Sequence, residues 1–168
     1  MTISHTAYNS IGRLKEGSSD VWVTPDYVIQ WAVQQWGDFT LDAAAHDWNA
    51  KAPRFFTIDD DALSISWVAD NVWLNPPYGR AMPKFVVKAV EEVKANRAGR
   101  VVCLLASRTD TRVFQDVIFP NASHIHFIKG RLKFERKDGQ TEYTANFASC
   151  FVVFDNRTEQ IVTYGAVE

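Results

Sequence analysis

An apolar strand, an amphipathic helix and a second apolar strand follow one another between residues 72 and 106. The segment 72–74 is apolar throughout, apolar residues from 82 to about 96 recur at helical spacing, and 101–106 is again entirely apolar. Strands without a polar face, separated by a helix, are typical of βαβ units in a parallel sheet that is covered on both sides. The pattern therefore predicts a three-layer α/β fold.

The remainder of the chain extends this pattern. Thr24 is expected to be the N-cap of the first helix and Pro25 its first residue. The turn-like pairs Asp138-Gly139 and Asn156-Arg157 are not separated by a helix, so we expect an antiparallel hairpin at the C-terminal edge of a mostly parallel, Rossmann-like sheet. The expected helices are 25–36, 82–96 and 111–118, and the expected strands are 39–41, 54–57, 72–74, 101–106, 124–128, 147–154 and 160–164.

A chain of 168 residues with 46% hydrophobic residues has the size and composition of one folded domain. We expect that domain at 20–168, preceded by a polar, flexible arm at 1–19. No apolar run approaches the roughly 20 residues of a membrane span, which predicts a soluble, cytoplasmic protein without membrane contact. Cys103 and Cys150 both lie in apolar runs and are expected to be buried, reduced thiols.

Charge is divided unevenly, with a net −6 over residues 1–71 and +4 over 72–168. This asymmetry suits an enzyme that binds a cationic small ligand and a polyanion, although unevenly solvated surface gives the same pattern. The acidic run 59–61 and the pair His124 and His126 lack further ligands at suitable spacing, so no metal site is predicted. A hydrolase or a kinase is disfavoured because no catalytic triad and no glycine-rich phosphate loop is present.

The tetrapeptide Asn75-Pro76-Pro77-Tyr78 directly follows the apolar strand 72–74. Open α/β folds bind their ligands at this edge of the sheet. Two prolines stiffen the loop and remove two backbone donors. The Asn75 side-chain oxygen and the Pro76 carbonyl can accept hydrogen bonds from a planar amino group, while Tyr78 can stack on its ring. These four residues are the predicted catalytic residues.

The Asn-Pro-Pro-Tyr loop resembles the catalytic motif of S-adenosylmethionine-dependent amino-methyltransferases, and the chain resembles the small phage and prophage DNA N6-adenine methyltransferases. The likeness covers about residues 20–154. The segments that carry it are 20–25, 41–45, 49–56, 61–67, 72–80 and 130–134. The resemblance implies a methyltransferase sheet, S-adenosylmethionine as cofactor and double-stranded DNA as substrate, in the cytoplasm of the host cell if the protein is phage-encoded.

The resemblance also implies which residues bind the cofactor, and Asn75 is included among them as well as among the catalytic residues. Trp22, Thr24 and Pro25 match an N-terminal cofactor motif, and free N–H groups of the helix that follows can meet a carboxylate. The Asp42 carboxylate can pair with the cofactor ammonium, or alternatively cap a helix. The loop after it has no glycine, but the small residues Ala43, Ala44 and Ala45 let the backbone approach the ligand.

A carboxylate that binds the cofactor's ribose hydroxyls is expected 17 to 19 residues beyond Asp42. Asp59, Asp60 and Asp61 lie in this range. Asp60 and Asp61 are included in the predicted cofactor site. The choice among the three carboxylates is open, and a solvated acidic turn accounts for at least two of them.

Basic residues near the predicted cleft are candidates for DNA contact. Alternation along a strand puts Arg131 and Lys133 on one face of a charged hairpin, whose alternative role is solvated surface. The predicted DNA-binding residues are Arg80, Arg108, Arg112, Lys129, Arg131, Lys133 and Arg136.

The sequence therefore predicts an enzyme that methylates the N6 amino group of a flipped-out adenine in DNA. Two alternatives stay open. The same tetrapeptide can serve amino groups in RNA or a glutamine amide in protein, and a catalytically idle nucleic-acid-binding protein can retain the fold. The oligomeric state and the DNA recognition sequence are not specified by these patterns.

Overall fold

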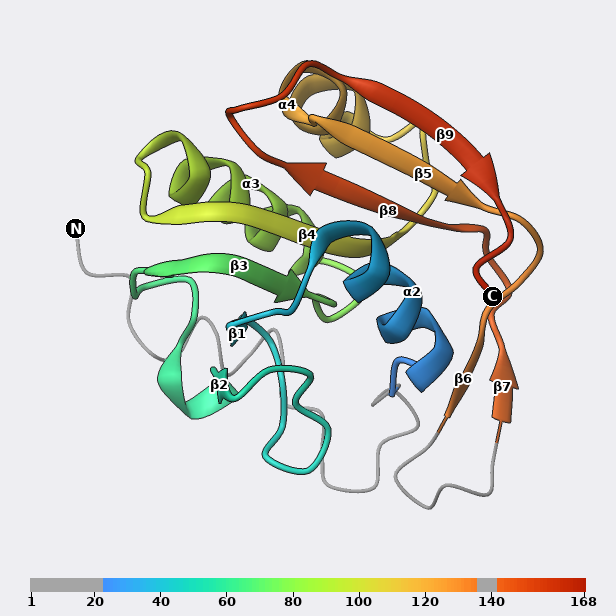
Figure 1. Cartoon of the computed structure of the whole chain (residues 1–168), viewed down its shortest axis with the longest axis horizontal. Coiled ribbons are helices and arrows are strands. Elements are labelled where there is room, and N and C mark those ends of the chain that lie inside the picture. The colour runs from blue at the N-terminus through green and yellow to red at the C-terminus, as the bar shows by residue number, and fades with distance from the viewer. Residues whose placement is uncertain (1–22, 136–141) are drawn as a thin grey trace.

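The computed structural model describes residues 23–135 and 142–168 and arranges them around a seven-stranded sheet (Figure 1). Its strands are β1 (Leu41–Asp42), β2 (Arg54–Phe55), β3 (Ala69–Leu74), β4 (Ala98–Ala106), β5 (His124–Ile128), β8 (Ser149–Phe154) and β9 (Ile161–Gly165). The helices are α2 (Asp26–Trp36), α3 (Met82–Lys94) and α4 (Phe119–Asn121), with a 3-10 turn η1 (Ile58–Asp60) and a π-helical turn η2 (Val113–Ile118). The expected arm at 1–19 lies outside the described residues.

The strands follow the order β2-β1-β3-β4-β8-β5-β9 across the sheet. Neighbours are parallel except that β8 is antiparallel to both β4 and β5. The mostly parallel, Rossmann-like α/β class is thereby confirmed. The expected pairing of the last two strands in an edge hairpin is wrong, because β5 lies between β8 and β9 and the edge strand β9 pairs with β5 in parallel.

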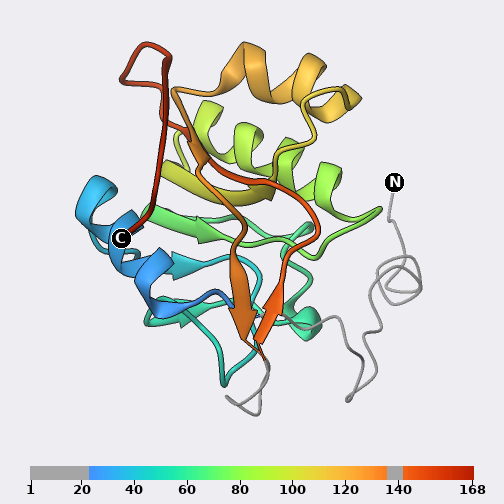
Figure 2. The same ribbon diagram turned by 90° about the vertical axis from the view of Figure 1, so that its right-hand side faces the viewer.

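Both faces of the central strands are buried, which explains their continuous apolar runs. In β4, Val101, Cys103 and Leu105 belong to the core cluster that includes α3, whereas Val102 and Leu104 belong to the cluster that includes α2. Figure 2 shows these two helices on opposite sides of the sheet. Cys103 and Cys150 are buried and free, as the sequence predicted.

A second, two-stranded sheet contains the predicted charged hairpin. Strands β6 (Lys133–Glu135) and β7 (Glu142–Thr144) pair in antiparallel fashion, with Phe134 opposite Tyr143. Glu135 also exchanges two backbone hydrogen bonds with Val23, of 2.9 and 3.2 Å. The hairpin is therefore joined to the segment that leads into α2.

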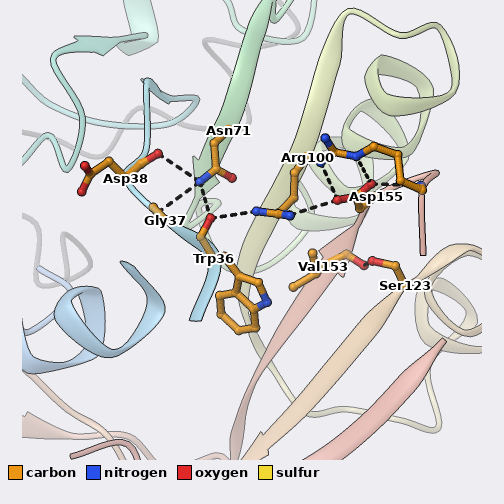
Figure 3. A network of polar contacts seen from close by, with 9 residues as sticks. Trp36, Gly37, Asp38, Asn71, Arg100, Ser123, Val153 and Asp155 are labelled. Atoms are coloured by element: carbon orange, nitrogen blue, oxygen red, sulfur yellow. Dashed lines mark hydrogen bonds and ion pairs between the residues drawn. The ribbon is translucent and has the colours of Figure 1, made fainter. Parts of the chain in front are cut away.

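A polar network fixes the carboxyl end of α2 (Figure 3). The Asn71 Nδ2 amide lies 3.0–3.1 Å from the carbonyl oxygens of Trp36, Gly37 and Asp38 and donates to them. Arg100 donates to the Trp36 carbonyl at 2.7 Å and to Asp155 at 3.1 Å. Because Asn71 lies early in β3, this contact directs the opposite end of α2 toward the residues that follow β3.

None of the helices in the described part of the chain is long and apolar enough to cross a membrane.

Candidate active site

The carboxyl ends of β1, β3 and β4 lie side by side and carry most of the predicted site residues. Asp42 ends β1 beside Trp73 of β3, and Asn75 follows the last residue of β3. Between β3 and α3, the predicted catalytic loop runs through Pro76, which is buried, and Pro77, which is half-buried. The parallel sheet therefore brings the Asp42 and Asn75 loops to one edge, as the sequence predicted.

The Asn75 side chain uses its donor and leaves its acceptor open. Nδ2 of Asn75 donates to Oγ1 of Thr24 at 3.0 Å, although the two residues are 51 positions apart. Oδ1 of Asn75 is shielded from solvent and accepts no hydrogen bond from the described residues. A buried amide oxygen without a partner is costly for a folded protein, which makes it a strong candidate for contact with a donor on a ligand.

The predicted N-cap was assigned to the wrong residue. Pro25 is the N-cap of α2, and no side-chain hydrogen bond caps that helix. Thr24 is 4% exposed, and its hydroxyl accepts the Asn75 bond instead. A Thr-Pro pair ahead of a helical pattern indicates a helix start, but it gives no signal for a contact with a residue 51 positions away.

Tyr78 lies half-buried against the hairpin region. Its ring centroid is 5.2 Å from that of Phe147 and 6.4 Å from that of Phe134 in β6. Its hydroxyl is shielded and has no partner among the described residues. Burial raises the pKa of Tyr78 above its usual value, so the phenol stays neutral at physiological pH.

Replacing Tyr78 by phenylalanine is expected to stabilise the protein by about 1 kcal/mol, because it removes a desolvated hydroxyl and keeps the packed ring. Urea unfolding of Tyr78→Phe measures the change. Tyr164→Phe is the matched control, because Tyr164 is 86% exposed and its hydroxyl is solvated. A clear loss of stability in Tyr78→Phe would show that the Tyr78 hydroxyl forms a stabilising hydrogen bond, contrary to this structure.

The Asp42 carboxylate organises the loop that follows β1. Its Oδ1 accepts from the Ala44 N–H at 3.2 Å, and its Oδ2 accepts from the Lys51 N–H at 3.0 Å. Burial raises the pKa of Asp42 to about 6, although the hydrogen bonds from Lys51 and Ala44 act in the opposite direction. Asp42 is therefore an incompletely compensated buried acid, at which a cation would be favourable.

Small residues line the start of this loop. Ala43 is fully buried, Ala44 is half-buried and Ala45 is 8% exposed. The backbone of the loop is held by the Ala43 N–H bond to the Trp73 carbonyl and by the Ala45 N–H bond to the Phe56 carbonyl, both 2.9 Å. This loop thus has methyl side chains on a hydrogen-bonded backbone and contains no glycine.

Local hydrogen bonds distinguish Asp60 from Asp61 in the acidic run 59–61. Oδ2 of Asp60 accepts from the N–H and the hydroxyl of Thr57, at 2.7 and 2.8 Å, and these bonds lower the pKa of Asp60. Asp60 thereby completes a capping box for η1. Asp61 forms no such side-chain bond within the described residues and adopts a left-handed conformation, with φ of 49°. The geometry favours Asp61 over Asp60 as a carboxylate available to a ligand.

The described basic candidates are exposed and follow the carboxyl ends of β3, β4 and β5. Arg131 and Lys133 are exposed, while the intervening Leu132 and the following Phe134 are buried; Lys133 begins β6, and Arg131 lies just ahead of that strand. The other exposed candidates are Arg80, Arg108, Arg112 and Lys129. Two predicted residues, Trp22 and Arg136, lie outside the described residues.

The sequence interpretation missed the aromatic support of the catalytic loop. Phe134 and Phe147 flank the Tyr78 ring, but in the sequence Phe134 stands in a charged hairpin and Phe147 begins the strand expected at 147–154. Nε2 of His124 and Nδ1 of His126 both contact the Thr163 hydroxyl, at 2.9 and 2.7 Å. Within residues 23–135 and 142–168, no group of three or more His, Cys, Asp or Glu side chains is arranged to hold a metal ion.

Comparisons with known proteins agree with this arrangement. Residues 12–167 match the family model described as DNA N-6-adenine-methyltransferase (Dam). A DNA N-6-adenine-methyltransferase of Haemophilus phage HP1 is 32% identical over 145 residues, covering 84% of this chain and 82% of that protein. A protein of the same description from Escherichia phage T1 is 34% identical over 134 residues, covering 79% of this chain and 54% of the T1 protein.

A structural comparison supports the fold alone. The crystal structure of a proposed RNA methyltransferase from Pyrococcus horikoshii superposes with a TM-score of 0.56 at 13% identity. The superposition covers 92% of this chain and 97% of the archaeal chain.

Proposed function

This chain belongs to the DNA N-6-adenine-methyltransferase (Dam) family, and on that premise we propose how its own residues methylate adenine. The activity is methylation of the N6 amino group of adenine in DNA, and the family and fold imply S-adenosylmethionine as the methyl donor. The proposal concerns which side chains act and how they do so.

The proposal rests chiefly on Oδ1 of Asn75, which has no partner among the described residues and lies just ahead of two prolines at the carboxyl end of β3. Oδ1 of Asn75 and the Pro76 carbonyl accept hydrogen bonds from the two N6 N–H groups of an adenine that has been flipped out of the duplex. Both bonds orient the N6 lone pair toward the methyl donor and stabilise the positive charge that develops on N6.

Tyr78 supports the adenine ring and does not act as a base. Its ring is fixed by Phe147 and Phe134, and its raised pKa keeps the phenol protonated. Stacking of an aromatic ring on a base contributes about 1–3 kcal/mol. In-line attack by N6 would break the bond between sulfur and the methyl group and release S-adenosylhomocysteine, and the extra N6 proton would pass to solvent water. No covalent enzyme intermediate is then needed.

The residues around Asp42 fit S-adenosylmethionine. The cofactor carries an ammonium group, which suits the buried Asp42 carboxylate, and the half-buried Ala44 beside it has only a methyl side chain. The cofactor carboxylate suits the N–H groups in the first turn of α2, after Pro25, and the cofactor ribose suits Asp61. When bound, the cofactor supplies an electrophilic methyl group on sulfur.

Cofactor affinity is expected to fall as pH falls from 7 to 5. The pKa of Asp42 is raised to about 6, and only the ionised carboxylate pairs with an ammonium, so affinity decreases toward tenfold per pH unit below 6. Calorimetric titrations at pH 7, 6 and 5 measure it. In Asp42→Asn, binding should be weaker at pH 7 and nearly independent of pH. A parent protein with pH-independent affinity would remove Asp42 from the cofactor site.

The exposed cations at the same edge contact DNA phosphates. Arg131 and Lys133 project from the face of the hairpin opposite Leu132 and Phe134, and Phe134 touches Tyr78. A phosphate contact at this face would therefore position the duplex relative to the catalytic loop. Arg80, Arg108, Arg112 and Lys129 extend the positive surface around the carboxyl edge of the sheet.

Loss of Arg131 and Lys133 is expected to flatten the salt dependence of DNA binding by about one unit of log–log slope for each lost phosphate contact. Titrations of Arg131→Ala, Lys133→Ala and the double variant at several salt concentrations measure the slope. Lys94→Ala is the control, because Lys94 is exposed at the carboxyl end of α3, away from this edge. A parental slope in the double variant would show that Arg131 and Lys133 do not contact DNA phosphates and that the hairpin is solvated surface.

The substrate class is tested by transfer of a labelled methyl group to DNA, RNA and protein in parallel. We expect incorporation into DNA alone, with none in Asn75→Ala. Incorporation into RNA or protein would show that the enzyme methylates an amino group of that substrate. Absence of transfer to all three, with the cofactor bound, would favour the idle nucleic-acid-binding alternative.

A further inference from the structure

Thr24 contacts the one side chain that the proposed reaction depends on most. Its hydroxyl oxygen lies 3.0 Å from Nδ2 of Asn75, in a position where Thr24 is 4% exposed. The hydroxyl does not cap α2, since the N-cap of that helix is Pro25 and no side-chain hydrogen bond caps it. The Thr24–Asn75 contact therefore has no role in helix capping.

The two ends of an amide are nearly equal in size but opposite in hydrogen bonding. Oδ1 accepts from an incoming amino group, whereas Nδ2 in the same place would set donor against donor. An amide that offers Oδ1 to the substrate must bury Nδ2 on its other side, and an unpaired buried donor is costly. Oγ1 of Thr24 gives Nδ2 an acceptor in that orientation.

We propose that Thr24 is a positioning residue for methyl transfer, which holds the Asn75 amide with Oδ1 toward the adenine amino group. The inference rests on the proposed function of Asn75 and assigns Thr24 a task other than cofactor contact. The backbone supports this task from both sides. Pro25, the residue after Thr24, has a φ angle restricted by its ring. Val23, the residue before Thr24, is held by its backbone hydrogen bonds to Glu135.

Two substitutions separate a positioning role from a cofactor contact. Thr24→Val keeps the shape and removes the acceptor, and Thr24→Ser keeps the hydroxyl. We expect single-turnover methyl transfer to fall about 10- to 100-fold in Thr24→Val and to stay within about threefold of the parent in Thr24→Ser. Cofactor affinity, measured by calorimetry, should stay within about twofold in both variants.

Two results would overturn the inference. The first is a parental transfer rate in Thr24→Val. The second is a loss of cofactor affinity in Thr24→Val as large as its loss of rate, which would make Thr24 a cofactor ligand. Melting curves of both variants ensure that only folded protein is compared.

The side-chain amide signal of Asn75 gives a readout that does not need activity. The signal is assigned by its disappearance in Asn75→Asp. Its protons should exchange slowly with solvent in the parent and in Thr24→Ser, and at least about tenfold faster in Thr24→Val. Equal exchange in all three would contradict the inference. If the parent transfers no methyl group to DNA, the proposed function fails, while this signal still decides whether Thr24 holds the amide.

Discussion

Replacing Asn75 by alanine is expected to lower the rate of methyl transfer about 10²- to 10³-fold while leaving the fold and cofactor binding intact. The expected size is that of losing one preorganised hydrogen-bonding group from a shielded site. The fold should persist because the Asn75 side chain makes one hydrogen bond, to Thr24, and its oxygen makes none within the described residues.

Single-turnover transfer to duplex DNA measures this effect, with calorimetry and melting curves on the same samples. Asn75→Asp is the matched variant and should retain part of the activity, because a carboxylate also accepts from an amino group. Tyr78→Phe should stay near the parental rate, whereas Tyr78→Ala, which removes the ring, should lose more. A near-parental rate in folded Asn75→Ala would contradict the proposed mechanism.

Replacing Glu92 by glutamine is expected to destabilise the protein by about 3 kcal/mol at pH 7, although Glu92 lies outside the candidate site. Glu92 is fully buried on α3. Its carboxylate accepts from Arg97 at 2.8 and 3.0 Å, from Lys88 at 2.7 Å and from the backbone N–H of Trp67 at 2.9 Å. Glutamine of the same shape leaves two cations without a counter-charge.

The pH dependence of that loss identifies its cause. Burial of Glu92 acts to raise its pKa, but the bonds from Arg97, Lys88 and Trp67 outweigh it and lower the pKa to about 2. A lowered pKa contributes stability that is present above the unfolded-state value near 4.5 and is lost as pH falls toward 2. Urea unfolding should show the difference between parent and Glu92→Gln shrinking over this range.

Glu91→Gln is the control for this measurement, because Glu91 is the exposed neighbour on the same helix. It should change stability by less than about 0.5 kcal/mol. Equal stabilities of parent and Glu92→Gln at pH 7, or a difference that does not vary with pH, would show that the buried ion pairs add nothing.

Local patterns predicted the elements well where burial is two-sided or periodicity is strong. The strand expected at 124–128 has the same bounds as β5, and the helix expected from 82 is α3. The strand expected at 101–106 begins earlier, at Ala98, because its polar start pairs with Ala69 and Asn71 of β3. Pairing of this kind depends on a neighbour and leaves no apolar signal in the strand itself.

Strand order could not be predicted from adjacency along the chain. Short connections favour pairing of β8 with β9, yet β5 lies between them, since β8 is apolar on both faces and pairs on both sides. The edge position suits β9, whose Ile161, Val162 and Tyr164 are exposed. Burial on both faces, rather than turn residues, decides which strand lies in the centre.

In the candidate site, too, local sequence predicted the positions of residues but not their contacts with distant neighbours. Residue types and their place at strand ends predicted Asp42 and Asn75 at one edge, because parallel strands bring their carboxyl ends together. The partners of those side chains were not predictable. Asp42 binds backbone N–H groups within its own loop, and Asn75 binds Thr24 across 51 residues, contacts that exist only once the chain has folded.

The most direct test is nucleoside analysis by mass spectrometry of DNA incubated with the purified protein and S-adenosylmethionine carrying a deuterated methyl group. We expect labelled N6-methyladenine in DNA from the parent, and at least about 100-fold less from Asn75→Ala at equal cofactor occupancy. Label on cytosine, or equal labelling of adenine by parent and Asn75→Ala, would contradict this expectation.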